Sequence, residues 1–133
     1  MQPDGLVTVK STSDPLETLS KIEKAIVETG MTVFARIDHT AGAKAAGLSL
    51  RPTEVIIFGN AKGGTPLMQA VQTIGIDLPL KILVWQDQAA DTWISYNDPS
   101  WLAARHALGS AVDKPVLAMT EKLAAVIAAA CAG

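Results

Sequence analysis

Two β-rich segments, residues 80–85 and 92–96, are separated only by a short polar turn over 87–91. Such a short connection brings the chain back beside itself, so the two segments predict an antiparallel hairpin. A parallel pair would need a crossover of a dozen or more residues. The hairpin therefore favours an antiparallel sheet, although the β–α alternation earlier in the chain is also typical of a doubly wound parallel sheet.

The rest of the chain alternates between strand-like and helix-like patterns. Asp14-Pro15-Leu16-Glu17 has the N-cap, the N1 proline and the acidic N3 residue of a capping box, and Gly30 predicts the end of that helix. Thr65-Pro66 predicts another helix start, with a stop at Gly75. We expect further strands at 5–10, 31–37 and 54–58, and further helices at 39–46, 98–106 and 113–130.

This order of elements predicts an α+β fold. Its first six main elements match the split βαβ arrangement of ferredoxin-like folds. We expect an antiparallel or mixed sheet of about five strands, in the order β-α-β-β-α-β-β, with helices packed on one face and a helical C-terminus. Residues 1–133 are expected to form a single domain, with a core over 5–109 and a C-terminal helix over 113–130.

Composition excludes several classes of partner and site. Of 133 residues, 49% are apolar and 18% are charged, and the net charge is -2 without a basic run. This balance argues against binding to nucleic acid or to an anionic membrane surface. A single cysteine excludes an intramolecular disulfide and a cysteine-rich zinc site. The N-terminus has no signal-peptide pattern and no apolar run approaches a membrane span, so we expect a cytoplasmic protein. We also expect no cofactor.

Polar residues gather at the ends of the expected strands. In a split βαβ sheet, strands one and two run one way and strands three and four run the other. The turn over 59–65 would lie at the opposite edge. The shared edge would collect eight polar residues, namely Ser11, Ser13, Asp38, His39, Arg51, Asp77, Tyr96 and Asn97. Asp77 and Lys81, on either side of Pro79, also predict a local salt bridge.

A glycine-rich turn over 59–64 is the clearest candidate for ligand binding. It has the G-x-x-x-x-G spacing of a phosphate-binding loop, but Thr65 and Pro66 stand where Lys and Ser or Thr are required. A nucleotide-binding P-loop is therefore excluded. Backbone amides at such a turn can still hold a small anion, whereas the alternative is an ordinary strand-to-helix turn. The candidate ligand-binding residues are Asn60, Gly63, Gly64, Thr65 and Arg51.

Histidines supply the only candidates for acid–base catalysis. His39 or His106 is a candidate acid–base group, with Asp38 or Asp77 as its partner. The spacing of these residues lacks any metal-binding signature, so no metal site is predicted. Whether the chain is an enzyme stays open, and the pattern favours a binding or interaction module over an enzyme.

An ordered series of short motifs resembles the family catalogued as domain of unknown function 302. The resemblance extends from Gly5 to about Gly109, with Ala61 as a departure where proline is expected after Gly-Asn. It rests on the motifs Ile37-Asp38-His39, Leu50-Arg51-Pro52-Thr53-Glu54, Ile57-Phe58-Gly59-Asn60, Gly64-Thr65-Pro66-Leu67-Met68, Ile76-Asp77-Leu78-Pro79-Leu80-Lys81 and Ser95-Tyr96-Asn97-Asp98-Pro99.

The resemblance implies a small α+β domain of the TATA-binding-protein-like type, with a strand order different from a split βαβ. It also implies a homodimer, and it supplies no catalytic residues. Independently, three tryptophans and an alanine-rich final helix in so short a chain favour self-association. The expected partners are therefore a second copy of the chain and a small anionic ligand.

Overall fold

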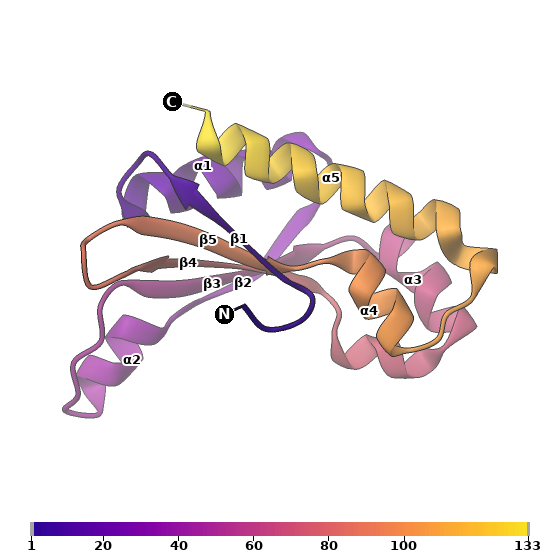
Figure 1. Ribbon diagram of the computed structural model, residues 1–133, viewed down its shortest axis with the longest axis horizontal. Coiled ribbons are helices and arrows are strands. Elements are labelled where there is room, and N and C mark those ends of the chain that lie inside the picture. Colours follow the sequence, from indigo (N-terminus) through magenta and orange to yellow (C-terminus); the bar gives the residue numbers. More distant parts are fainter. Residues whose placement is uncertain (1, 133) are drawn as a thin grey trace.

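Five strands form one antiparallel sheet in the computed structural model, which describes residues 2–132 (Figure 1). The order across the sheet is β1-β5-β4-β3-β2, and every neighbouring pair is antiparallel. The expected α+β fold with an antiparallel sheet is confirmed. The strands are β1 (Leu6–Ser11), β2 (Thr32–Asp38), β3 (Thr53–Gly59), β4 (Leu80–Gln86) and β5 (Thr92–Asn97).

The direction of β4 differs from the split βαβ expectation. The β4–β5 hairpin forms as predicted, with Trp85 opposite Trp93. However, β3 and β4 are antiparallel neighbours, so β1, β2 and β4 run one way and β3 and β5 the other. The helix between β3 and β4 lies beyond the end of the sheet and not across its face (Figure 1). The chain therefore returns beside β3 in the opposite direction.

Two long helices, α1 (Pro15–Glu28) and α5 (Asp113–Cys131), cover one face of the sheet (Figure 1). The predicted cap of α1 is present, since Asp14 Oδ1 accepts a hydrogen bond from the Glu17 amide at 2.8 Å. Apolar side chains at helical spacing on α1 and α5 meet alternate residues of the central strands, which buries both sets. Fully buried members of this core are Ile22, Ile26, Ile56, Phe58, Ile82, Ile94 and Val126.

The segment predicted as a glycine-rich turn is helical. Asn60 is the N-cap of α3 (Ala61–Ala70), and its side-chain Oδ1 accepts a hydrogen bond from the Gly63 amide at 2.7 Å. Because Asn is among the best N-cap residues, the helix begins before the predicted start at Thr65 and contains Pro66. It also ends earlier than Gly75, at Ala70, and a 3₁₀ turn over Gln72–Ile76 follows.

Two short helices complete the fold. α4 (Pro99–Arg105) begins as expected, with Asp98 as its N-cap, and it lies at the same end of the sheet as α3 (Figure 1). A 3₁₀ turn over Ser110–Val112 leads from there into α5. α2 (His39–Ala45) projects from the opposite end, on the side of the sheet away from α5, and has no buried residue (Figure 1).

Candidate functional site

The eight polar residues expected on one edge lie at both ends of the sheet. Ser11 ends β1 and Ser13 follows it, and these two lie at the same end as Asp38, which ends β2, and Arg51, which precedes β3. Asp77 precedes β4, and Tyr96 and Asn97 end β5, so these three lie at the opposite end, where β3 also finishes. The prediction of a shared edge was wrong for Asp77, Tyr96 and Asn97, because β4 runs with β1 and β2.

At the first end, Asp38 and Arg51 make structural contacts. The Asp38 carboxylate accepts a hydrogen bond from the Ala41 amide at 2.9 Å and so caps α2. The Arg51 guanidinium donates to the backbone carbonyl of Gln86 at 3.3 Å. Arg51 is therefore remote from α3, with which it was grouped as a ligand-binding residue. His39 begins α2 and faces a hollow on the sheet.

At the other end, Asp77 is the centre of a polar cluster. Its Oδ2 lies 2.5 Å from His106 Nε2, and both carboxylate oxygens lie 2.8 Å from the same guanidinium nitrogen of Arg105. His106 Nδ1 is 2.9 Å from the Thr73 hydroxyl. The predicted partner of Asp77, Lys81, instead donates to the Pro79 carbonyl at 3.2 Å. The structure thus joins two of the four catalytic candidates, Asp77 and His106.

A cavity of about 500 Å³ lies between the first turn of α3, the start of β4 and α5. We call it the α3 cavity. Four of the five predicted ligand-binding residues line it, namely Asn60, Gly63, Gly64 and Thr65. The remaining lining residues are mostly apolar, with two lysines: Met31, Phe34, Gly59, Ala61, Lys62, Pro66, Met68, Leu78, Pro79, Leu80, Pro115, Ala118, Met119 and Lys122.

The two glycine amides proposed as anion donors are already hydrogen-bonded. The Gly63 amide donates to Asn60 Oδ1, and the Gly64 amide donates to the Asn60 carbonyl at 3.2 Å. Gly64 acts on the cavity in a different way. A Cβ placed there would lie 3.5 Å from Leu78 Cδ1 and 3.8 Å from Met68 Cε, so the missing side chain leaves room in the cavity.

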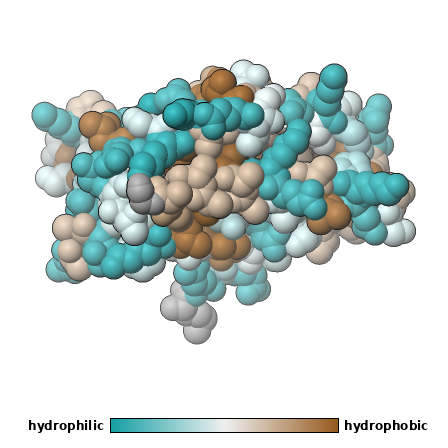
Figure 2. Space-filling view, turned by 90° about the horizontal axis from the view of Figure 1, so that it is seen from above, coloured by the Kyte–Doolittle hydropathy of each residue, from teal (hydrophilic) through white to brown (hydrophobic). Residues whose placement is uncertain are grey.

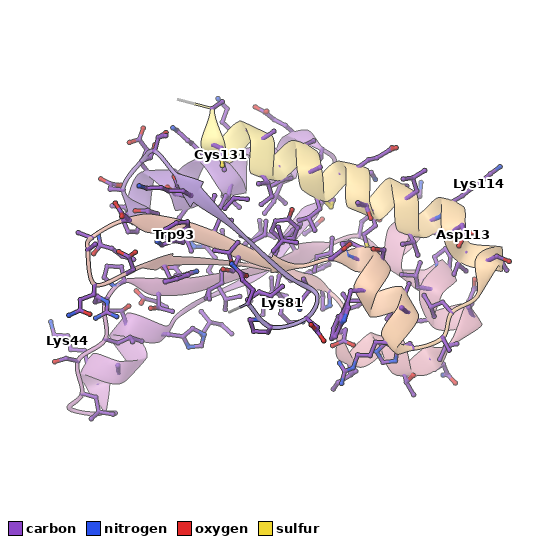
Figure 3. The ribbon with its side chains drawn as sticks, viewed as in Figure 1. Lys44, Lys81, Trp93, Asp113, Lys114 and Cys131 are labelled. Atoms are coloured by element: carbon purple, nitrogen blue, oxygen red, sulfur yellow. The ribbon has the colours of Figure 1, made fainter. Side chains whose placement is uncertain are left out.

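The sheet face opposite α1 and α5, which we call the open face, carries a second hollow of about 720 Å³. Alternation along the strands turns mostly apolar and aromatic residues to this side. Figure 3 shows Lys81 on this side of the sheet, away from α5. Residues on the hollow include Leu6, Thr8, His39, Val55, Lys81, Leu83 and Trp85.

Two tryptophans of the open face are held by hydrogen bonds. The Trp85 and Trp93 rings stack with centroids 6.2 Å apart, and Trp85 Nε1 donates to the Ser95 hydroxyl at 2.9 Å. Trp93 Nε1 donates to Asp87 Oδ2 at 2.8 Å. This hydrogen bond, with further ones from backbone amides, lowers the pKa of Asp87 below its ordinary value.

The α3 cavity contains residues that a sequence pattern does not identify. Met31 and Met119 have the spacing of core residues, and both are indeed largely buried, at 6% and 9% exposure. Phe34 faces the cavity because the pairing of β2 with β3 shifts register between Val33 and Ala35. Such a bulge redirects a side chain without a mark in the hydrophobic pattern.

The described residues contain neither a metal-binding cluster nor a membrane-spanning helix. Over residues 2–132, no group of three or more His, Cys, Asp and Glu side chains lies close enough to hold a metal ion. Within the same residues, none of the helices has the length and apolar character needed to cross a membrane.

Part of two longer bacterial proteins is similar in sequence to this chain. Relatives 51% identical over 115 residues include "Fluoride-specific ion channel FluC 1" of Brucella suis biovar 1 (strain 1330) and of Brucella abortus biovar 1 (strain 9-941). The match covers 86% of this chain, but only 45% and 43% of the two relatives. The chain therefore spans less than half the length of these relatives.

A solved structure and a family model match nearly the whole chain. The crystal structure of an uncharacterized conserved DUF302 protein from Bacillus stearothermophilus superposes with a TM-score of 0.84 at 21% identity, covering 98% of this chain and 100% of that one. The family model "Domain of unknown function DUF302" matches residues 7–130. The resemblance found in the motifs is thereby confirmed, and the chain belongs to the DUF302 family.

Proposed function

We propose that this chain is a binding module for a small molecule, with the α3 cavity as its site. The observation that carries the proposal is the cavity itself, about 500 Å³ with a mainly apolar lining. Ligand sites are typically concave and apolar, with a few polar groups that orient the ligand, and they fall in this range of volume. Asn60 and Thr65 supply polar groups, and Lys62 and Lys122 supply positive charge.

Gly64 provides a direct test. A leucine at this position would extend toward Leu78 and Met68 and fill part of the cavity. Gly42 in α2 is a matched control, because it is also helical and a Cβ there would meet nothing within 4 Å. Both substitutions remove a helical glycine, so they change helix propensity alike.

The experiment is a thermal-shift screen of metabolites on three proteins. Compounds that raise the melting temperature of the wild type should lose their effect in Gly64→Leu and keep it in Gly42→Leu, because stabilisation follows the occupancy of the site. Gly64→Ala, whose Cβ makes only ordinary contacts, serves if Gly64→Leu does not fold. Compounds that stabilise all the variants equally would place the site elsewhere, and the absence of any stabilising compound would contradict the module.

We also propose that the module is a homodimer formed through the open face. α2 has no buried residue, and seven residues are too few for a helix that is stable without packing. Ile37, Leu48 and Leu50 beside it are 44%, 67% and 44% exposed. Five strands about 4.8 Å apart and about 20 Å long present a flat area of roughly 500 Å². This is about 60% of the roughly 800 Å² that each partner contributes to a specific interface, so α2 and the residues beside it would have to supply the rest.

Light scattering at micromolar concentration tests the dimer and its interface. A charge at Leu83, in the middle of the open face, should produce monomers in Leu83→Lys. Leu117→Lys is the control, because Leu117 is an exposed apolar residue of α5, which lies on the other side of the sheet from the open face. A monomeric wild type would refute the dimer.

Figure 2 shows hydrophobic atoms along the middle of the face seen from the α5 side, where the row Ala124, Ala125, Ala128 and Ala129 is exposed. Dissociation by Ala125→Lys but not by Leu83→Lys would place the interface on α5.

The cytoplasm is the location that we propose for the module. A chain with one cysteine cannot form an intramolecular disulfide, which fits a reducing compartment. In the Brucella relatives a similar domain is part of a longer protein named as a fluoride-specific ion channel. A ligand-binding module in such a chain would act as an accessory to the channel. Cell fractionation tests the location, and recovery in a secreted fraction would contradict it.

An acid–base enzyme is the second candidate function, favoured by the contact of Asp77 with His106. A carboxylate that contacts one imidazole nitrogen can orient the other toward a hydroxyl, here that of Thr73. Neither Asp77 nor His106 lines the α3 cavity or the open-face hollow. An activity screen with Asp77→Asn and His106→Gln tests this candidate. A turnover lost in both variants would support it, and one retained in both would reject it.

A further inference from the structure

The α3 cavity combines an apolar interior with positive charge at its mouth. Lys62 on α3 and Lys122 on α5 both line the cavity, and both are exposed. Neither forms an ion pair with any residue of the described range 2–132. Within that range, the lining contains no Asp or Glu. The lining therefore contains two ammonium groups and no carboxylate to balance them.

The apolar lining of the α3 cavity suits a flexible apolar group. Met31, Met68 and Met119 all line it, and methionine side chains adapt to irregular shapes because they are unbranched and polarisable. Phe34, turned toward the cavity by the β-bulge, is 55% exposed and adds an aromatic wall at the surface. Exposed aromatic surface at the edge of a cavity is covered when an apolar ligand enters.

The size of the cavity limits the length of the ligand. At roughly 30 Å³ for each water-sized atom, a volume of about 500 Å³ would hold on the order of fifteen non-hydrogen atoms. Since the cavity opens to solvent, a ligand of about ten such atoms fills its inner part and reaches the mouth. A medium-chain carboxylate has this size.

We propose that the ligand of the α3 cavity is an amphipathic anion, a carboxylate with an unbranched apolar chain of medium length. This inference rests on the proposed binding module and names its ligand class. The chain lies among the three methionines, and the carboxylate lies between the ammonium groups of Lys62 and Lys122. The interaction with the two lysines weakens with salt, because both are at the surface.

Isothermal titration calorimetry with four probes separates the contributions of head and tail. The probes are octanoate, neutral octanamide, cationic octyltrimethylammonium and acetate. We expect octanoate to bind at least tenfold more tightly than octanamide, equivalent to about 1.4 kcal/mol. We expect acetate and the cationic probe to bind more weakly still. Equal affinity for octanoate and octanamide would overturn the anionic head, and equal affinity for acetate and octanoate would overturn the apolar tail.

A pair of double variants tests which lysines hold the head. In Lys62→Gln/Lys122→Gln the preference for octanoate over octanamide should fall to about twofold, with the affinity for octanamide unchanged. Lys24→Gln/Lys44→Gln removes the same charge from exposed positions on α1 and α2 and should keep the preference. An unchanged preference in the first double variant would overturn the assignment.

Failure of this inference differs from failure of the module. If octanoate does not bind but screened compounds still depend on Gly64, the ligand class is wrong and the module stands. If no compound depends on Gly64 either, both are wrong.

Discussion

Replacement of Asp77 by alanine should lower the free energy of unfolding by about 2–3 kcal/mol. The side chains of His106 and Asp77 are 9% and 14% exposed, so their 2.5 Å contact is largely shielded from water. A hydrogen bond to a charged group in such a place contributes about 1.5–3 kcal/mol. Arg105 is 51% exposed, and its contact with Asp77 adds only about 0.2–1 kcal/mol.

A double-mutant cycle isolates the contact from other effects of the substitutions. The variants are Asp77→Ala, His106→Ala and the double variant, with urea unfolding at neutral pH followed by circular dichroism. With a denaturant dependence of about 1–3 kcal/mol per molar urea, the single Asp77 variant should shift the midpoint by roughly 1 M. The coupling energy between Asp77 and His106 should be about 1.5–3 kcal/mol.

A second cycle on Lys24 and Glu28 provides the reference for a weak pair. Their charged atoms are 4.0 Å apart and both side chains are mostly exposed, so a coupling of at most about 0.5 kcal/mol is expected. If Asp77 and His106 couple no more strongly than this pair, the reasoning from burial and distance is refuted. The contacts of Asp77 with Arg105 and His106 would then contribute little to the packing of α4 against the 3₁₀ turn before β4.

Three further predictions concern a close contact, a titration and a helix cap. Gly5→Ala should lower the free energy of unfolding by at least about 2 kcal/mol, because Gly5 has a φ of +76° and the new Cβ would lie 2.2 Å from the Trp101 ring. Urea unfolding measures this, and an unfolding midpoint equal to that of the wild type would contradict the prediction. Burial, with the nearby Asp98 carboxylate, raises the pKa of Tyr96, the only tyrosine of the sequence. Phenolate absorbance should therefore appear only at a pH above the ordinary tyrosine pKa of 10.0, and the stability of the fold should fall as the pH increases through that range. Asp98→Asn should reduce the shift, and a wild-type titration at the ordinary pKa would refute the prediction. Asn60→Ala should cost about 1 kcal/mol in thermal unfolding through loss of the α3 cap, and no loss would mean that the helix begins later.

Elements with strong local signals were predicted well from the sequence. The Asp14 capping box placed the start of α1 at its observed position, and the short turn over 87–91 predicted the β4–β5 hairpin. Both signals lie within a few residues of the feature that they determine. Neither depends on contacts with distant parts of the chain, so one sequence is enough to find them.

Features that depend on competition or on distant packing were predicted less well. In the segment after β3, glycines indicated a turn, but the Asn60 side chain supplies a cap strong enough to begin a helix across them. The direction of β4 depends on where α3 packs, and α3 contacts α5, which is distant from it in the sequence. The wrong direction for β4 then placed Asp77 at the wrong end of the sheet.

The candidate sites show the same division between local and distant signals. Asp77 and His106 were both singled out by residue type, yet their contact spans 29 positions of sequence and required the structure. The Asn60–Thr65 segment was found by its glycines, but the Gly63 and Gly64 amides are already hydrogen-bonded, and Gly64 instead contributes space to the cavity. A cavity is formed by what side chains leave unfilled, and its lining here comes from β2, β3, α3, β4 and α5 and the loops beside them. Core methionines and a bulge-directed Phe34 form much of its apolar lining, which explains why the phosphate-loop pattern indicated the α3 part of the cavity but not the rest.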